Sequence, residues 1–296
     1  MTRTLIVGSG FIGRAVAARL TTAGEHAVLA SRRAPAARTA APWVSLDATD
    51  GTSCARVVDQ VRPDRIVLVH GPSDVTWCEA APERAIALHT AVAAHLTAAA
   101  PGARTVLIST DNVFDGRSPA NDESTPTAPA NAYGRAKLAA EEIVCEAADS
   151  TVLRVSLVYG WEDSESGKWL NFFSACAHPL RRGESVEAPF DQWTTPVLVQ
   201  DVAAVTAAVL HAEAPPLLHL GGPDRISRAA WAEAVADGLG LPRTQVVRVP
   251  KAGGRYANRP TNTCLTSHLL GDFLHDRGLR VRGVDEGIRT LLEVTE

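Results

Sequence analysis

A short apolar run at residues 4–7 leads directly into glycines at positions 8, 10 and 13, and an alanine-rich stretch follows. In such a pattern the first glycine allows a tight turn, the second lets a pyrophosphate approach the backbone, and the third lets a helix pack closely on a strand. The N-terminus of that helix offers unpaired N–H groups to phosphates. The sequence therefore predicts a dinucleotide-binding strand–turn–helix unit, with cofactor contacts at Gly8, Gly10, Phe11, Ile12 and Gly13.

The first half of the chain alternates short apolar runs with longer helical stretches. Runs that are apolar throughout are typical of strands buried on both faces of a sheet, and β–α alternation predicts a parallel sheet. We therefore expect an α/β fold, a Rossmann-type doubly wound parallel sheet with a smaller C-terminal substrate-binding lobe. The expected strands are 4–7, 26–29, 44–46, 65–69, 105–108, 151–155 and 217–220, and the expected helices lie near 12–22, 53–62, 78–100, 131–148, 169–181 and 200–213.

The charge balance excludes several classes of partner. Among 296 residues, 46% are hydrophobic and 21% charged, and the formal net charge is -4 with no cluster of basic residues. Nucleic acids and anionic membranes both require clustered positive charge, so we expect neither as a partner. The five cysteines form no CxxC pair, and histidines and carboxylates show no metal-ligand spacing. We therefore expect a cytoplasmic protein that binds a small molecule and no metal.

The end of the second expected strand indicates which dinucleotide is bound. An acidic residue about 20 positions after the glycines would hold the adenosine ribose of NAD, but this chain has Ser31, Arg32 and Arg33 there. A carboxylate would repel a 2′-phosphate, whereas guanidinium groups can hold it with bidentate hydrogen bonds. NADP(H) is therefore the expected cofactor. Asp47, after the third strand, is expected to bind the adenine amine or else to cap a helix.

This assignment divides the chain into two parts. Residues 1–160 are expected to form an NADP-binding Rossmann domain, to which residues 194–225 return. Residues 161–193 and 226–296 are expected to form the substrate-binding lobe. That lobe would lie over the carboxyl edge of the sheet, where open α/β sheets usually bind ligands.

A tyrosine and a lysine four residues apart mark the expected catalytic centre. Tyr133 and Lys137 lie on one face of an expected helix. A phenol is a poor acid at neutral pH, and a nearby ammonium group stabilises the phenolate. This spacing is common by chance, but the fifth strand ends at Ser109 and Thr110 some twenty residues upstream. A hydroxyl at that edge of the sheet can hydrogen-bond the same substrate oxygen.

Together these motifs resemble the extended short-chain dehydrogenase/reductases, and within them the dTDP-4-dehydrorhamnose reductases and related sugar-nucleotide 4-ketoreductases. The resemblance covers nearly the whole chain. It is carried by residues 8–13, 109–116, 123–126, 131–137, 153–160, 171–172, 191–196 and 201–203.

The resemblance assigns roles to individual residues. It implies that Thr110, Tyr133 and Lys137 form a catalytic triad, in which Tyr133 protonates the substrate, Thr110 orients the carbonyl and Lys137 holds the nicotinamide ribose. His70 and Gly71 stand where the family places small residues beside the nicotinamide, and His89 stands where an asparagine is usual. The expected substrate contacts are Asp111, Asn112, Asn171, Trp193, Thr194, Thr195 and Arg259.

The expected function is that of an NADPH-dependent ketoreductase of deoxysugar biosynthesis, acting on a nucleotide-linked 4-keto-6-deoxysugar. One alternative is an epimerase or dehydratase of the same superfamily. The dehydratases carry Thr-Asp-Glu where this chain has Thr110-Asp111-Asn112, and an amide cannot remove a proton from carbon 5. Another alternative is a non-catalytic NADP-binding regulatory subunit, as in the similar β-subunits of methionine adenosyltransferase. The sequence also allows a homodimer. It leaves open the individual sugar, whether the substrate is a sugar or another carbonyl compound, and the product stereochemistry.

Overall fold

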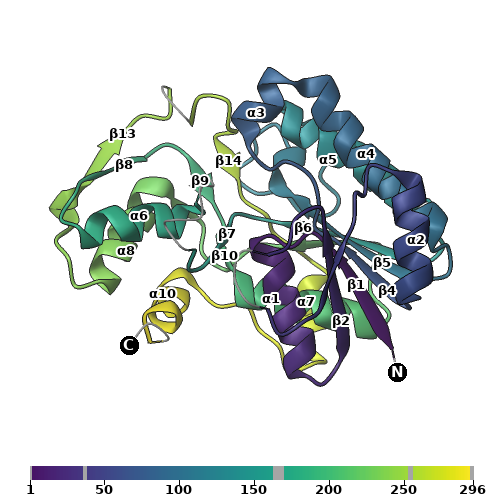
Figure 1. Ribbon diagram of the computed structural model, residues 1–296. Helices are drawn as coiled ribbons and strands as arrows, with labels where there is room; N and C mark the ends of the chain where they lie inside the picture. Colours follow the sequence, from purple (N-terminus) through teal and green to yellow (C-terminus); the bar gives the residue numbers. More distant parts are fainter. Residues whose placement is uncertain (1, 36–38, 163–169, 253–255, 294–296) are drawn as a thin grey trace.

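A seven-stranded parallel sheet organises the computed structural model, which describes residues 2–35, 39–162, 170–252 and 256–293. The order of the strands is β11-β6-β5-β4-β1-β2-β3, so the chain moves outward from the centre in two directions (Figure 1). This architecture confirms the α/β, Rossmann-type fold expected from the sequence. The strands are β1 (Arg3–Val7), β2 (His26–Ser31), β3 (Trp43–Ser45), β4 (Arg65–Leu68), β5 (Arg104–Thr110), β6 (Ser150–Val155) and β11 (Leu217–Leu220).

Helices cover both faces of this sheet, and each face has its own apolar core. On one face the core includes Ile6 and Val67 of the strands, with α1 (Phe11–Thr22), α7 (Val199–His211) and α9 (Leu270–His275) packed over them. On the other face Leu5 and Leu68 pack under α2 (Gly51–Val61), α4 (Pro82–Ala99) and α5 (Ala132–Cys145). Central strands buried on both sides explain why these segments are apolar throughout.

The single helix expected near 78–100 is two helices in the structure, α3 (Val75–Ala80) and α4. Between them Ala81 has φ -142° and ψ 61°, which is not helical, and Pro82 begins the next helix. A residue before proline is disfavoured in the α region, while proline is well suited to the first position of a helix. The apolar pattern continued across this break, which is why it concealed the boundary.

A second group of elements packs around its own apolar core beside the sheet. This core includes Tyr159, Phe173 and Trp231, all of them fully buried. The helices around it are α6 (Phe172–Arg181), α8 (Arg228–Gly238) and α10 (Val284–Glu293). The strands β7 (Val158–Tyr159), β8 (Val186–Pro189), β9 (Trp193–Thr194), β10 (Val197–Leu198), β12 (Ile226–Ser227), β13 (Val246–Val249) and β14 (Asn262–Thr263) complete this region.

That the second group is a substrate-binding lobe remains a prediction, and residues 163–169, 253–255 and 294–296 of it lie outside the described part.

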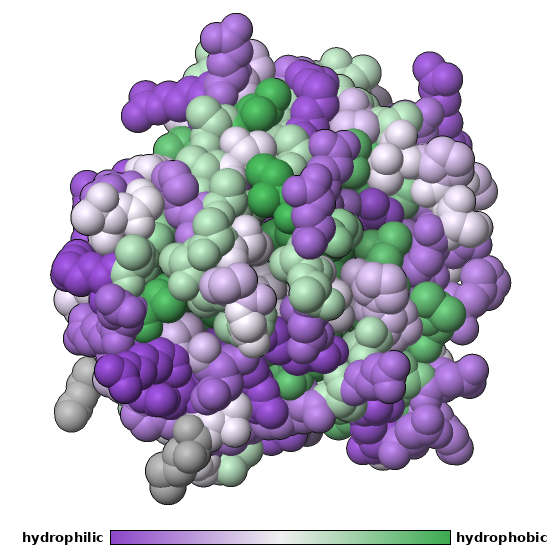
Figure 2. Space-filling model, turned by 90° about the vertical axis from the view of Figure 1, so that its right-hand side faces the viewer, coloured by the Kyte–Doolittle hydropathy of each residue, from purple (hydrophilic) through white to green (hydrophobic). Residues whose placement is uncertain are grey.

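The face of the molecule turned to the viewer in Figure 2 shows separate apolar areas interspersed with polar side chains. Within the described residues, none of the helices combines the length and apolar character that crossing a bilayer demands.

Candidate active site

The glycine turn joins β1 to α1 at the point where the strand order reverses. Gly8 has φ +121°, and a Cβ placed on it would lie 2.0 Å from the carbonyl oxygen of Val69, at the end of the neighbouring β4. A Cβ on Gly13 would lie 1.8 Å from the oxygen of Gly8. Gly10 is the N-cap of α1 and provides no side-chain cap. The turn therefore requires its glycines, and the first N–H groups of α1 can receive an anion.

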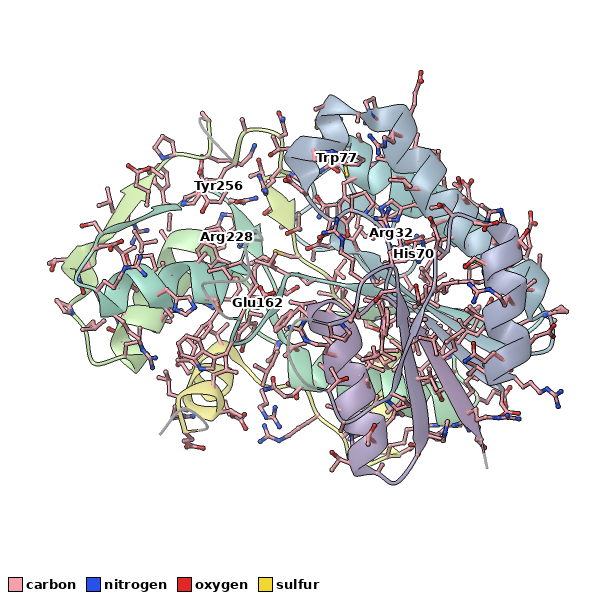
Figure 3. The ribbon with its side chains drawn as sticks, in the orientation of Figure 1. Arg32, His70, Trp77, Glu162, Arg228 and Tyr256 are labelled. Atoms are coloured by element: carbon pink, nitrogen blue, oxygen red, sulfur yellow. The ribbon has the colours of Figure 1, made fainter. Side chains whose placement is uncertain are left out.

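Arg32 and Arg33 follow the last residue of β2, and both are exposed at the same end of the sheet. Figure 3 shows both Arg32 and His70 in the half of the molecule that contains the seven-stranded sheet. Asp47 is also exposed, and its Oδ1 accepts from the N–H and hydroxyl of Thr49 at 3.1 and 2.7 Å. These hydrogen bonds hold the pKa of Asp47 below its usual range. The N-cap of α2 is Asp50, so Asp47 does not cap that helix.

Tyr133, Thr110 and Lys137 come together where β5 ends beside α5. Asn131 caps α5, its Oδ1 accepting from the N–H of Gly134 at 2.8 Å, and Tyr133 therefore lies in the first turn. The Thr110 hydroxyl lies close enough to the Tyr133 hydroxyl to lower the pKa of the phenol. Lys137 lies one turn further along and donates from Nζ to the carbonyl oxygen of Ile108 at 2.7 Å. The structure thus brings together the three residues that the sequence marked as catalytic.

Burial dominates the electrostatics of this trio. Burial raises the pKa of Tyr133 far above its usual value. The interaction with Thr110 lowers this pKa, and the negative charge of Asp111 and the nearby Cys78 raise it further. Burial also lowers the pKa of Lys137 to about 8, against the opposing effect of Glu141. The sequence led us to expect that Lys137 would lower the phenol pKa, and the direction found here is the opposite. The Lys137 ammonium is directed to a backbone carbonyl, and desolvation outweighs its influence.

Asp111 and Asn112 continue from Thr110 into a short 3-10 turn, Asp111–Val113. Asn112 donates from Nδ2 to Oδ1 of Asp111 at 2.8 Å, and Asn131 donates to Oδ1 of Asn112 at 2.8 Å. Ser156 donates to the other oxygen of Asp111 at 3.2 Å. Burial raises the pKa of Asp111 to about 6 despite these bonds. Both predicted substrate residues therefore lie next to the three predicted catalytic residues, and hydrogen bonds within the protein hold them there.

His70, which is half-buried, and His89, which is buried, lie beside each other near Tyr133. His70 donates from Nε2 to the oxygen of His89 at 3.1 Å, and His89 donates from Nε2 to the oxygen of Pro72 at 3.2 Å. Carbonyl oxygens only accept, so both imidazoles carry their proton on Nε2. Burial and the nearby Lys137 lower the pKa of both rings, which are therefore neutral at physiological pH. Gly71 has φ +91°, and a Cβ there would lie 2.1 Å from the His89 ring.

Most of the predicted substrate residues in the second region have their polar groups occupied within the protein. Asn171 caps α6 and donates from Nδ2 to Gly160 and Glu162 at 2.8 and 2.9 Å. Thr194 and Thr195 are buried, and their hydroxyls bond to Ser156 and to the backbone of Leu265. Through these contacts the three side chains hold segments of the protein together, a role that the sequence motifs did not reveal.

Trp193 and Arg259 are more accessible. The guanidinium carbon of Arg225 lies 4.2 Å from the centre of the Trp193 ring. Arg259 lines a cavity of about 320 Å³ between the start of α5 and the segment before β14, with Glu79, Asp115, Lys251, Asn258 and Thr261.

Arg228 is a candidate functional residue that the motifs did not identify. Its guanidinium carbon lies 4.7 Å from the centre of the Phe172 ring and 5.9 Å from that of Trp231. The residue is 6% exposed, its Nε has no hydrogen-bond partner, and no carboxylate of the described residues forms an ion pair with it. Burial lowers its pKa to about 10. A buried cation with no direct ion pair among the described residues is costly, which makes Arg228 a candidate to bind an anion.

The sequence did carry one signal for Arg228. It directly follows Ser227, the N-cap of α8, and a positive charge in the first turn of a helix opposes the helix dipole. Figure 3 shows Arg228 and Tyr256 across from Arg32 and His70, in the other half of the molecule. Interactions with Asp111 and Arg259 also affect the pKa of Arg228, so its guanidinium group interacts electrostatically with both of these predicted substrate residues.

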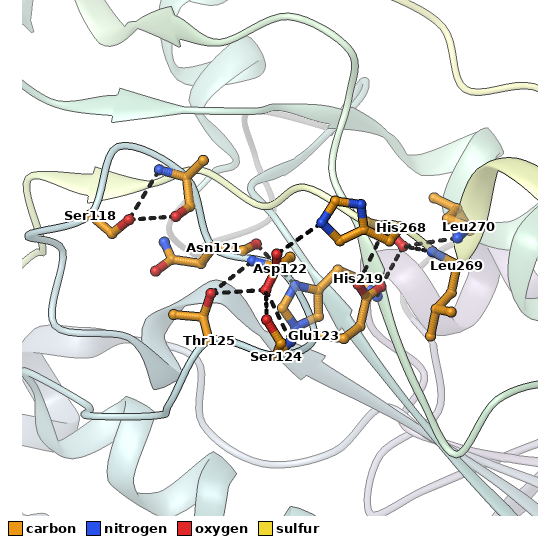
Figure 4. Close-up of polar contacts among 12 residues, drawn as sticks. Ser118, Asn121, Asp122, Glu123, Ser124, Thr125, His219, His268, Leu269 and Leu270 are labelled. Atoms are coloured by element: carbon orange, nitrogen blue, oxygen red, sulfur yellow. Dashed lines mark hydrogen bonds and ion pairs between the residues drawn. The ribbon is translucent and has the colours of Figure 1, made fainter.

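Two buried networks support the carboxyl edge of the sheet. Arg154 of β6 forms an ion pair with Glu141 of α5 at 2.7 Å, and the Ser109 hydroxyl also donates to Glu141. The second network is drawn in Figure 4, where Glu123 accepts from the N–H of His219 at 2.9 Å and from the hydroxyl of Ser267. The loop before α5 is thereby tied to β11 and to the start of α9.

Among the residues that the structure describes, no three His, Cys, Asp or Glu side chains gather as metal ligands.

Comparisons with known proteins agree with this architecture. The model of the family described as "RmlD substrate binding domain" matches residues 2–293. A dTDP-4-keto-6-deoxy-D-glucose reductase of Streptomyces niveus is 31% identical, covering 73% of this chain and 72% of its own. The methionine adenosyltransferase 2 subunit beta of Rattus norvegicus is 28% identical, covering 90% and 81%. The crystal structure of dTDP-4-dehydrorhamnose reductase from Bacillus anthracis in complex with NADP has a TM-score of 0.84 at 23% identity, covering 100% of both chains.

Proposed function

The chain belongs to the RmlD substrate-binding domain family, and on this basis we propose that it is an NADPH-dependent ketoreductase of a nucleotide-linked 4-keto-6-deoxysugar. The observation that carries the proposal is the meeting of Tyr133, Thr110 and Lys137 at the end of β5. A phenol and a hydroxyl that lie this close together can both reach one carbonyl oxygen. This arrangement suits the reduction of a ketone to an alcohol.

The residues at the reversal of strand order fit NADP(H). The turn has no room for side chains at Gly8 and Gly13, so a pyrophosphate can approach the backbone and the N-terminus of α1. Arg32 and Arg33 are exposed where a 2′-phosphate would need cations, and no carboxylate stands beside them in the chain. The bound cofactor would supply the hydride.

The protein's own groups then manage the proton and the orientation of the substrate. Thr110 donates to Oδ1 of Asp111 at 3.2 Å, and with substrate bound this proton would turn to the carbonyl oxygen and orient it. Tyr133 gives its proton to that oxygen as negative charge develops there. The raised pKa of Tyr133 keeps the phenol protonated before the reaction. Lys137 holds the nicotinamide ribose, and its positive charge favours the phenolate that remains after proton transfer.

The second region supports an anionic, nucleotide-linked substrate. Arg228 is buried and forms no ion pair with a carboxylate of the described residues, and Arg259 and Lys251 line the nearby cavity. A diphosphate is an anion that such cations recognise well. We assign Arg228 and Arg259 to this part of the substrate and Asp111 and Asn112 to its sugar.

The direct test is to incubate the protein with NADPH and a panel of nucleotide-linked 4-keto-6-deoxysugars, following absorbance of NADPH and the mass of the product. We expect oxidation of NADPH and a product two mass units heavier. A parallel incubation supplies dTDP-glucose with NAD or NADP. Loss of water from dTDP-glucose would overturn the assignment, because Asn112 cannot serve as the base that elimination requires.

A second candidate function follows from the 28% identity to methionine adenosyltransferase 2 subunit beta over 90% of the chain. In that case the protein would bind NADP(H) and act as a subunit of another enzyme without catalysing a reaction. The same incubations separate the two functions. Tight NADPH binding with no turnover across the whole panel would favour the subunit and contradict the reductase.

A further inference from the structure

The hydroxyl of Ser31 lies at the centre of three hydrogen bonds. Its Oγ is 2.7 Å from the carbonyl oxygen of Arg33, 2.7 Å from Oγ of Ser9 and 3.0 Å from Nε1 of Trp43. A carbonyl oxygen only accepts and an indole N–H only donates. Ser31 therefore gives its single proton to Arg33, and it accepts from Trp43 and Ser9.

This assignment of protons changes the role of Ser31. The sequence placed Ser31 with the two arginines as a contact of the 2′-phosphate. In the structure its donor is used by Arg33 and its two lone pairs by Trp43 and Ser9, so the hydroxyl has no proton left for a phosphate oxygen. The arginines remain the groups with free donors at this turn.

The three bonds connect three different elements. Ser9 belongs to the glycine turn after β1, Ser31 is the last residue of β2, and Trp43 is the first residue of β3. Trp43 is half-buried and packs against the apolar core under α1. The backbone also links these strands, since Leu46 donates to the oxygen of Ser31 at 3.0 Å. The turn with Arg32 and Arg33 is thereby fixed relative to the turn for the pyrophosphate.

We propose that Trp43 and Ser9 are positioning residues that, through Ser31, set the selectivity for a dinucleotide bearing a 2′-phosphate. The inference rests on the proposed use of NADP(H). A guanidinium group discriminates through directed, bidentate hydrogen bonds, so its backbone must be held in place. A dinucleotide without the 2′-phosphate makes no use of this turn, and its pyrophosphate contacts at the glycines stay intact.

The test is the dissociation constant of NADPH and of NADH, each measured by fluorescence for the wild type and for Trp43→Phe. Phenylalanine keeps the aromatic packing and loses only the N–H. We expect the NADPH constant to rise about threefold to tenfold, the equilibrium effect of one hydrogen bond, with the NADH constant unchanged. An unchanged ratio of the two constants, or an equal rise in both, would overturn the proposal.

Trp161→Phe is the matched control, because Trp161 also donates from Nε1, to the oxygen of Leu291 at 2.8 Å, in the other half of the molecule. It should leave the ratio of the two constants unchanged. Ser9→Ala removes the second donor to the same oxygen and provides a milder variant should Trp43→Phe fail to fold. We expect it to raise the NADPH constant selectively as well, and an equal effect on both dinucleotides would again contradict the inference.

The wild type distinguishes this inference from the proposed function. If the wild type binds neither dinucleotide, the proposed function and the inference both fail. If it prefers NADPH and the variants leave that preference intact, the inference alone fails.

Discussion

The glycine-turn side of the sheet and the region around α6 and α8 differ in how their candidate residues are held. On the sheet side, Gly8, Tyr133 and Lys137 lie at strand ends and on one helix face, where the backbone alone places them. In the second region Asn171 and Thr195 use their polar groups to join segments far apart in the sequence. Conversely Arg228, which belongs to no motif, is buried there and has no ion pair with any carboxylate in the part of the chain that the structure describes.

The contrast teaches that a motif is most informative where local backbone geometry decides what a side chain can reach. Where a residue lies at a strand end or on a helix face, the backbone of its own segment already determines which few neighbouring residues its side chain can reach. Between segments that meet only on folding, the same residue type can either bind a ligand or satisfy the protein's own backbone. Variants of each region should therefore affect different steps, and the following predictions test that separation.

The largest effect is expected from Tyr133→Phe. Removing the proton donor should lower kcat about a hundredfold to ten-thousandfold, the range for general acid catalysis, while NADPH binding stays near normal. Single-turnover rates and the NADPH dissociation constant measure the two quantities separately. A variant that keeps most of its activity would show that the proton comes from elsewhere.

Arg32→Ala and Arg33→Ala should each act on the cofactor alone. Loss of a charge-assisted contact to the 2′-phosphate is expected to lower the preference for NADPH over NADH about tenfold to a hundredfold. The ratio of kcat/KM for the two cofactors reports it. The wild type must prefer NADPH for this prediction to stand, and equal use of both would refute it.

Arg228→Met should act on the substrate alone and so sharpen the comparison between the two regions. Methionine keeps apolar contact with Phe172 and removes the charge. We expect KM for the sugar nucleotide to rise about tenfold, with the NADPH dissociation constant unchanged. Arg243→Met removes an exposed arginine that pairs with Asp237 at the far end of the same helix, and it serves as the control. An equal effect of both substitutions on KM would show that Arg228 does not belong to the substrate-binding site.

The smallest effect is the pH dependence that Lys137 imposes. Its pKa is lowered to about 8 by burial, so the ammonium is present below that pH and lost above it. We expect kcat/KM to fall about twofold by pH 8 and to continue falling above it. Lys137→Arg keeps the charge and should flatten this limb of the profile. His70 and His89 are already neutral, so they should add no break at neutral pH.

The lowered pKa of Lys137 also affects stability, which should change with pH in the opposite direction to kcat/KM. Between pH 8 and the ordinary pKa of lysine, the unfolded chain holds a proton that the folded chain has released. The free energy of unfolding should therefore rise with pH through this window as far as Lys137 contributes. Urea unfolding of the wild type and of Lys137→Met at both ends of the window measures the difference. An identical pH dependence for the two proteins would contradict the lowered pKa.

Much of the sheet, and the meeting of Tyr133, Thr110 and Lys137 at the end of β5, could be predicted from the sequence. Continuous apolar runs located the strands, and four-residue spacing placed Tyr133 and Lys137 on one helix face. The break at Ala81 was missed because the apolar periodicity continued through it. The bonding of Ser31 was missed because Ser9 and Trp43 reach it from other strands.

By itself the sequence determined the parallel α/β fold, the glycine turn and the residues at the end of β5, because these depend on short-range periodicity and on steric limits of the backbone. Only the tertiary structure decided which polar groups are already occupied. Within the described residues, the Ser31 hydroxyl donates to the backbone of Arg33, Nε of Arg228 has no hydrogen-bond partner, and burial raises the pKa of Tyr133. The physical reason is that hydrogen bonding and desolvation depend on all the segments that meet at a point, and their meeting is set by packing.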